Sequence, residues 1–259
     1  MKRELISRRA ALGGVVSAGG LVLAGCDKLS ANNTFQNMLE SAEHLSLGAQ
    51  RSVLSSSAPL AKEYQTSDIS RVFKANGTVR PDTPVYQRFL ENQFMDWRLK
   101  IDGLVKQPVE LSLDEIKAMP ARTQITRHDC VEGWSAIGQW TGVQLSRILA
   151  MAQLEPNARY LVFHCMDDLL GSRDGSGLYY ESIDLVDAFH PQTIMAYSMN
   201  GQVLPIRHGA PIRLRVERQL GYKMAKYVQR IEAVESFSKM AIGKGGFWED
   251  RGYEWYAGI

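Results

Sequence analysis

Residues 127–134 read Arg-His-Asp-Cys-Val-Glu-Gly-Trp, a polar segment with a single cysteine, Cys130. Arg127, His128 and the turn-forming Gly133 surround this cysteine. Nearby positive charge favours the thiolate form, and a thiolate is a good ligand for soft metals. We therefore expect Cys130 to be a metal ligand, although an unpaired cysteine is also common as a small buried apolar residue.

A helical pattern follows the cysteine segment. After the run from Trp140 to Gln144, apolar residues recur at helical spacing at positions 145, 148, 149 and 152. Such a helix would pack the cysteine turn against the core.

This arrangement resembles the molybdenum-cysteine segment of the sulfite-oxidase family of molybdopterin enzymes. It is most similar to the bacterial exported branch that includes the catalytic subunit of protein-methionine-sulfoxide reductase, in which a Cys-Val-Glu-small-Trp run supplies the metal thiolate. The resemblance extends from about Thr83 to Phe237. It implies an α+β domain with the sulfite-oxidase (molybdopterin-binding) fold, which has mixed sheets and flanking helices, and a molybdenum–molybdopterin cofactor ligated by Cys130.

A second informative region covers residues 199–214 and 221–227. Asn-Gly at 200–201 predicts a tight turn between strands, and Gly209 allows a close approach of the backbone. Cations at fixed positions suit an anionic cofactor, and the candidates are His208, Arg213, Lys223 and Lys226. Each alone is typical of a solvated charge, but the whole pattern is similar to the family's pterin-phosphate site. The cofactor contacts that this resemblance implies are His208, Arg213, Met224 and Lys226, together with Glu91, Asn92 and Cys165.

Two positions differ from true sulfite oxidases. Those enzymes have arginines where this chain has Glu91 and Gly133-Trp134. A carboxylate would repel a sulfite dianion, so we expect a neutral S-oxide or N-oxide as substrate, with Trp134 either as an aromatic wall or as core packing. Because the chain has no Cys-x-x-Cys-His haem motif, the electrons should come from a partner, and a membrane b-type cytochrome is the natural candidate.

Residues 1–25 read as a targeting segment. Ser-Arg-Arg at 7–9 resembles a twin-arginine export signal, and Leu-Ala-Gly-Cys at 23–26 resembles a lipobox that makes Cys26 the acylated first residue. The expected location is the periplasm, with a lipid anchor in the inner membrane, and Asp27 is a weak retention cue. The segment carries four positive charges and one negative charge, so its removal changes the net charge from +2 to −1. No nucleic-acid footprint remains.

The mature chain divides into an N-terminal tether with packing helices, residues 26–80, and one molybdopterin-binding domain, residues 81–259. No room remains for an appended dimerisation domain, so a monomeric catalytic subunit is expected. The patterns predict helices at 35–45, 60–64, 113–119 and 183–188, strands at 97–101, 122–126 and 160–165, and a hairpin from 97–101 to 104–105.

Two other classes of protein stay open at this point. Cys130 and Cys165 are the only cysteines after Cys26, and in an oxidising compartment they would be able to form a disulfide. The chain would then be a cofactor-free binding protein. The other alternative is a sulfite-type oxidase with the same metal site.

Overall fold

The computed structural model describes residues 59–172 and 174–259, and residues 60–259 form one compact unit. The predicted targeting segment and the predicted helix at 35–45 lie outside the described residues. The fold below is therefore that of the unit from Leu60 to Ile259.

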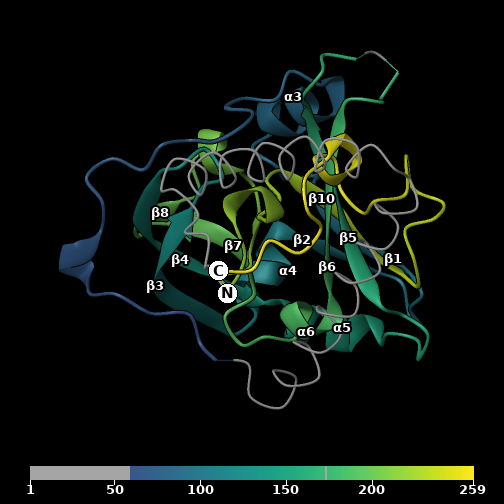
Figure 1. Ribbon diagram of the computed structural model, residues 1–259, viewed down its shortest axis with the longest axis horizontal. Coiled ribbons are helices and arrows are strands. Elements are labelled where there is room, and N and C mark those ends of the chain that lie inside the picture. The colour runs from purple at the N-terminus through teal and green to yellow at the C-terminus, as the bar shows by residue number, and fades with distance from the viewer. Residues whose placement is uncertain (1–58, 173) are drawn as a thin grey trace, which may run out of the picture. The chain divides into compact units, whose positions relative to one another are not determined.

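The first sheet has five strands in the order β2-β1-β10-β5-β6 and is shown at the right of Figure 1. Only β1 and β10 pair in parallel, and the other neighbours are antiparallel. The sheet is therefore mixed, as predicted. Its strands are β1 (Arg98–Gly103), β2 (Val109–Ser112), β5 (Tyr160–Asp168), β6 (Leu178–Asp184) and β10 (Val228–Val234).

The second sheet is antiparallel and carries the cysteine segment at the end of its longest hairpin. Its order is β3-β4-β7-β8, with β9 also paired to β7 (Figure 1). The β3–β4 register runs from Ala121 opposite Val143 to Asp129 opposite Ser135, which leaves residues 130–134 as the connecting turn. Its strands are β3 (Ala121–Asp129), β4 (Ser135–Gln144), β7 (Ile194–Met199), β8 (Gln202–Val203) and β9 (Arg213–Arg215).

Short helices connect these strands, which makes the fold α+β as predicted. The α-helices are α3 (Pro84–Glu91), α4 (Leu113–Ala118), α5 (Leu145–Ala152) and α6 (Leu185–Ala188). The 3₁₀ helices are η1 (Thr66–Asp68), η2 (Ile206–His208), η3 (Gly221–Lys223) and η4 (Glu249–Arg251).

Local sequence explains α4 and α5. Ser112 caps α4 by accepting a hydrogen bond from the Glu115 amide at 3.1 Å, while the Glu115 carboxylate accepts one from the Ser112 amide. In α5 the apolar residues at 145, 148, 149 and 152 are all buried, which confirms the predicted stripe.

The main hydrophobic core draws residues from both sheets, including Leu99 and Ile101 of β1, Val143 of β4 and Leu214 of β9. Complete burial of an aliphatic side chain of this kind contributes about 1.5–3 kcal/mol, so this shared core holds the two sheets together.

Three local predictions were wrong. β1 pairs with β2, not with residues 104–105, and Gly103 serves a close approach instead: a Cβ there would lie 2.3 Å from the carbonyl oxygen of Ala233 on β10. Residues 60–64 are not helical, because Glu63 bridges to Thr126 on β3. Helix α6 starts two residues later than predicted, and Asp184 caps it.

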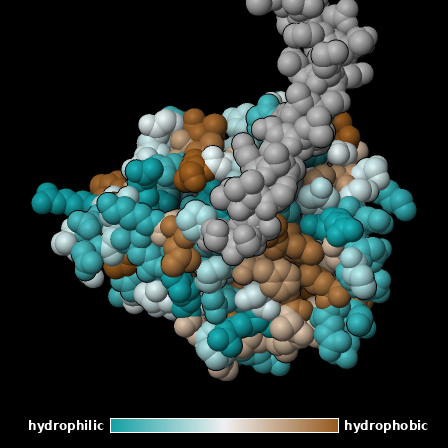
Figure 2. Space-filling model, turned by 60° about the horizontal axis from the view of Figure 1, so that its bottom comes forward, coloured by the Kyte–Doolittle hydropathy of each residue, from teal (hydrophilic) through white to brown (hydrophobic). Residues whose placement is uncertain are grey.

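The surface near α5 and α6 mixes apolar patches with hydrophilic side chains (Figure 2). Exposed apolar residues on these elements include Met151 in α5 and Phe189, which follows α6. None of the helices in the described part of the chain has the length and apolar character needed to span a bilayer.

Candidate active site

Cys130 lies in a tight turn at the end of β3. Its amide donates to the carbonyl of Trp134 at 2.9 Å, and its carbonyl accepts from the amide of Gly133 at 2.9 Å. Gly133 has a φ of +84°, a conformation that side chains other than glycine's rarely tolerate. The turn therefore fixes the position of the thiol between two long, paired strands.

The electrostatics around Cys130 differ from the sequence prediction. Arg127 does not face the thiol, because its guanidinium pairs with Asp129 at 2.9 Å. Burial raises the pKa of Cys130; the backbone amide of Glu132 and the charge of Lys74 lower it and the Glu132 carboxylate raises it, and burial prevails. The expectation of a thiolate favoured by local positive charge was therefore wrong. A bound metal would have to displace the thiol proton, as it does at most cysteine ligands.

Cys130 opens into a pocket of about 160 Å³. Segments far apart in the sequence form its walls: the strap at 76–78, the cysteine turn, the end of β5, η3 and the C-terminal segment. Its lining includes the side chains of Glu132, Asp167, Met224, Lys226, Trp248 and Tyr253.

Lys226 forms the cationic part of this pocket. Its ammonium group donates to the carbonyls of Asn76 at 2.6 Å and Arg207 at 3.2 Å, and also to that of Thr78. Burial lowers the pKa of Lys226, the positive charge of Arg213 lowers it further, and the Asp167 carboxylate opposes both effects. The amine is thus a buried cation whose partners are mostly neutral carbonyls.

Arg213 and His208 lie beside Lys226. The Arg213 guanidinium donates to the carbonyls of His208 at 3.0 Å and Met224 at 3.2 Å, and its Nε atom has no partner among the described residues. Burial and the charge of Arg215 lower the pKa of Arg213 to about 9. Burial, followed by the charges of Arg213 and Lys226, lowers the pKa of His208 to about 4.

Gly209 makes this gathering possible. It has a φ of +112°, and a Cβ at this position would lie 2.9 Å from the Cβ of Lys226 and 3.1 Å from that of Arg213. The predicted close approach at 208–209 is therefore an approach to these two cationic side chains.

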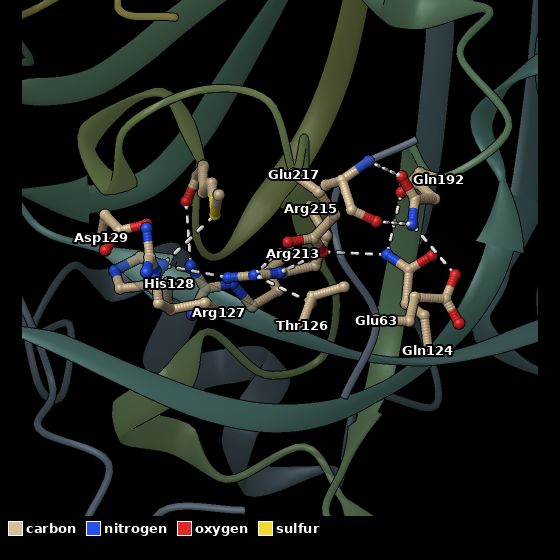
Figure 3. Close-up of polar contacts among 12 residues, drawn as sticks. Glu63, Gln124, Thr126, Arg127, His128, Asp129, Gln192, Arg213, Arg215 and Glu217 are labelled. Atoms are coloured by element: carbon tan, nitrogen blue, oxygen red, sulfur yellow. Dashed lines mark hydrogen bonds and ion pairs between the residues drawn. The ribbon is translucent and has the colours of Figure 1, made fainter. Parts of the chain in front are cut away.

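A polar network lies behind these cations (Figure 3). Arg215 forms a buried ion pair with Glu217, with contacts of 2.5 and 2.9 Å, and also donates to His128 Nδ1 at 3.0 Å. Gln124 donates to Glu217 at 2.9 Å, and Gln192 donates to Glu63 at 2.9 Å, so the network reaches the segment before η1. His128 is held neutral here, because burial and the charge of Arg215 lower its pKa well below the usual value.

The other predicted contacts are placed differently. Met224 lines the pocket, and its sulfur lies 3.3 Å from His128 Nδ1. Cys165 is buried on β5 and does not line the Cys130 pocket. Glu91 and Asn92 lie at the end of α3, where Glu91 is exposed and Asn92 bonds to Asp96 at 2.8 Å, also away from the pocket lining.

Trp134 also lies outside the pocket lining. Its indole donates to Glu132 at 3.0 Å, and its ring packs near His128 and Phe73. Trp248 and Tyr253 instead supply the aromatic wall, with stacked rings whose centroids are 5.2 Å apart.

Sequence reasoning missed this wall and the strap at 76–78. The strap lies in the stretch predicted to be a tether, and the wall lies near the C-terminal end of the predicted domain, each more than 45 residues from the cysteine turn. Just before the strap, the ring of Phe73 lies 5.5 Å from that of His128 and 5.6 Å from that of His208. Asn-Gly at 76–77 predicts a turn, and a turn motif alone does not indicate which site it contacts.

The protein side chains around Cys130 suit a metal that an organic cofactor already ligates. Cys130 and Cys165 are both free thiols, which argues against the alternative of a disulfide-stapled protein. Within residues 59–172 and 174–259, no group of three or more His, Cys, Asp or Glu side chains converges. The metal would therefore take one thiolate from the protein and most other ligands from an organic cofactor.

Comparison with known proteins supports this chemistry. Residues 86–241 match the family described as the oxidoreductase molybdopterin binding domain. Over 256 residues the chain is 37% identical to YedZ1 of Azospira oryzae, which is named as a candidate protein-methionine-sulfoxide reductase subunit. That match covers 98% of this chain and 89% of the relative.

The chain therefore belongs to the molybdopterin-binding oxidoreductase family and is an enzyme with a molybdopterin cofactor. A more distant likeness is to the crystal structure of the sulfane dehydrogenase SoxCD from Paracoccus pantotrophus, with a TM-score of 0.49 and 23% identity. It covers 54% of this chain, and this chain spans 39% of that one.

The residues present fit this cofactor. The pterin ends in a phosphate. Three buried basic side chains gather beside the Cys130 pocket, and none of them forms an ion pair among the described residues: His208, Arg213 and Lys226. Uncompensated buried cations are costly, and an anion at this place would stabilise them. Lys223 was also a candidate, but it is already neutralised by two carboxylates.

Proposed function

We propose that this protein is the catalytic subunit of an exported reductase that removes oxygen from a neutral S-oxide, with methionine sulfoxide as the favoured class. An N-oxide is the nearest alternative of the same reaction type. The name of the Azospira oryzae relative supports the S-oxide, and it also describes that protein as a subunit.

The observation that carries the proposal is the lining of the Cys130 pocket. Trp248 and Tyr253 form an aromatic wall, Val131 and Leu169 add apolar surface, and Lys226 is the only Lys or Arg side chain among the described residues that line it. A methyl sulfide group packs well against aromatic rings, with a contribution of about 0.3–1.5 kcal/mol for each sulfur–aromatic contact.

The same lining disfavours sulfite. Glu132 and Asp167 bring carboxylates to the pocket, although burial raises the pKa of Asp167. A carboxylate 4 Å from an anionic substrate would repel it by about 1–4 kcal/mol, depending on local hydration. Glu91 was expected to have this role, but the carboxylates in position to act are Glu132 and Asp167.

When bound, the molybdenum–molybdopterin group supplies two-electron oxygen-atom transfer. Cys130 provides the protein's thiolate to the metal, while Arg213, His208 and Lys226 hold the anionic end of the cofactor. Trp248 and Tyr253 orient the substrate and exclude water from one side of it. The protein thus positions cofactor and substrate and sets the charge around them.

The N-terminal segment supports export and membrane attachment as part of this proposal. The twin-arginine segment at 7–9 suits export of a protein folded around its cofactor, and Cys26 suits lipid attachment at the periplasmic face of the inner membrane. A membrane b-type cytochrome would deliver electrons one at a time. Lysine replacement of both Arg8 and Arg9 should leave the protein in the cytoplasm, and Cys26→Ser should release it from membranes in a soluble form.

The substrate test is steady-state kinetics of the molybdenum-loaded protein. With a reduced viologen dye as donor, we expect turnover of methionine sulfoxide, dimethyl sulfoxide or trimethylamine N-oxide, and little oxidation of sulfite with cytochrome c as acceptor. Efficient sulfite oxidation without turnover of any neutral oxide would assign the protein to the sulfite-oxidase class instead.

A charge variant sharpens this test. Glu132→Gln should improve kcat/KM for sulfite relative to wild type and leave KM for methionine sulfoxide nearly unchanged. Glu110→Gln, at an exposed position of β2, is the matched control and should change neither. Equal effects of Glu132→Gln on both substrates would show that charge does not select between them.

A further inference from the structure

Exposed basic side chains gather on the surface beside the Cys130 pocket. Residues 69–81 include three basic residues and no acidic one, and residues 199–216 add one more exposed cation, again without an acidic residue. We call this surface the basic face. Its cations have no ion pair among the described residues, and they are Arg71, Lys74, Arg80 and Arg207.

The first part of the basic face is fastened to β4. The amide of Ser70 donates to the carbonyl of Ile137 at 3.0 Å, and the amide of Ile137 donates to the Ser70 hydroxyl at 2.9 Å. The Phe73 ring then packs edge-on against Trp140, with centroids 5.5 Å apart. These inward contacts leave the side chains at positions 71, 72 and 74 exposed on the outside of the second sheet (Figure 1).

Lys226 joins the two segments of the basic face. Its ammonium group binds the carbonyls of Asn76, Thr78 and Arg207, so the three backbones meet at one atom. The chain at Arg207 therefore lies directly beside the strap at 76–78, which lines the Cys130 pocket. The basic face thus borders the pocket.

Three valines lie among these cations and are unusually exposed for apolar side chains. Val72, Val79 and Val203 are 79%, 52% and 77% exposed. Val203 belongs to this surface because Leu204, the next residue, is buried in the same cluster that Phe73 packs against. Surfaces that bind membranes combine such residues, since apolar side chains enter the headgroup region while cations attract anionic lipids.

The attraction has to come from this arrangement, because the whole protein has no excess of positive charge. The chain without residues 1–25 has a net charge of −1, as calculated above from the sequence. The acidic residues at the borders of the basic face are Asp68 and Asp82, at its two ends in sequence, and Glu132, in the cysteine turn. An anionic surface would therefore be attracted to this face and not to the protein as a whole.

We propose that the basic face binds the surface of a membrane that contains anionic phospholipids, and that it turns the Cys130 pocket toward the bilayer. This inference goes beyond the proposed function, because it depends neither on the substrate nor on the lipid anchor. The exposed valines favour a lipid surface over an acidic protein surface.

Such a contact would set the orientation of the enzyme. The expected anchor at Cys26 precedes Leu60 by 34 residues, and an extended tether of this length reaches about 110 Å. A tether of this kind keeps the domain near the membrane without orienting it. The basic face would add the orientation and bring the metal site close to a membrane-bound electron donor.

The test is vesicle co-sedimentation of the cofactor-loaded mature chain, residues 26–259, with Cys26→Ser so that no lipid is attached. We expect binding at low ionic strength to vesicles in which half the lipid is phosphatidylglycerol, and none to pure phosphatidylcholine. At physiological ionic strength the screened attraction should weaken and release the unlipidated protein.

Charge variants locate the contact. Each cation near an anionic membrane surface contributes about fivefold to binding, so Arg71→Gln/Lys74→Gln should bind about 25-fold more weakly. Lys106→Gln/Lys117→Gln removes the same charge from exposed positions outside the basic face and should bind like the wild type. Thermal unfolding checks that both variants are folded. Equal losses in the two variants would overturn the proposal.

A fluorescent label shows which surface meets the lipid. A polarity-sensitive dye on Val72→Cys should shift to the blue when phosphatidylglycerol vesicles are added, whereas the same dye on Met151→Cys, an exposed position of α5, should not. Shifts of equal size at both positions would contradict a defined orientation and overturn the proposal.

Two other occupants of the basic face predict different results. If residues 27–58 of the same chain cover it, the mature chain will bind no vesicles. If an acidic protein is the partner, the wild type will ignore vesicles but bind immobilised polyglutamate, and Arg71→Gln/Lys74→Gln will lose that binding. Either result overturns the membrane contact and leaves the assignment of the substrate unaffected.

Discussion

Around Lys223 one ammonium faces two carboxyls, whereas around Arg213 three basic side chains gather with no ion pair among the described residues. Both clusters are buried, and both lie beside the pocket that contains Cys130. The first needs only a proton to be neutral, and the second needs an anion. A buried cluster that one proton neutralises needs no ligand, whereas a buried cluster of basic side chains without carboxylates indicates an anionic ligand.

The largest expected effect concerns Cys130, the proposed metal ligand, which lines the pocket beside both clusters. Cys130→Ala should abolish turnover, because a methyl group cannot replace a soft thiolate. The protein should remain folded, since the side chain is small and lies in a turn. Steady-state kinetics and thermal unfolding together measure this, and wild-type turnover in the variant would remove Cys130 from the metal site.

Breaking a balanced pair should cost stability. Glu217→Ala leaves the fully buried Arg215 without its carboxylate, and removal of one partner of a buried pair costs about 3–5 kcal/mol. Glu232→Ala is the control, because its pairs with Arg230 and His164 are partly exposed and contribute about 1 kcal/mol or less. Urea unfolding of both variants checks the difference, and equal losses would contradict it.

A smaller effect should appear in acid. The folded-state pKa of His208 is lowered to about 4 from an ordinary 6.5, so the unfolded chain binds the proton more readily. This contribution to stability is complete above pH 6.5 and is lost as the pH falls through 4. Thermal unfolding of cofactor-free protein should show a weaker dependence on pH in His208→Asn, and an identical dependence would assign the loss to other groups.

The parts of the fold with local causes could be predicted from sequence. Helix α4 follows from Ser112 and Glu115 three residues apart, and the predicted α+β family fold was confirmed. The parallel pairing of β1 with β10 could not be predicted, because β10 lies more than 120 residues away in the chain. The predicted charge around Cys130 failed for a similar reason, since Arg127 pairs with Asp129.

In the site, sequence reasoning proposed Lys226 and Arg213, and the structure brings them together. It did not identify Trp248 or Tyr253, because their stacking emerges only when the C-terminal segment folds back onto the pocket. It also grouped Lys223 with the free cations, since Glu181 and Glu249 stand 42 and 26 residues away in the chain. Charge balance inside a core is a long-range property, and single motifs do not reveal it.

The most direct test of the incomplete cluster is the molybdenum and pterin content of purified protein from a molybdopterin-competent host. Wild type should contain one of each per chain. Charge-assisted hydrogen bonds contribute about 1.5–3 kcal/mol each, so Arg213→Ala/Lys226→Ala should lose most of its cofactor, while Arg230→Ala, a partly exposed control on β10, keeps it. Full occupancy in the double variant would contradict the account.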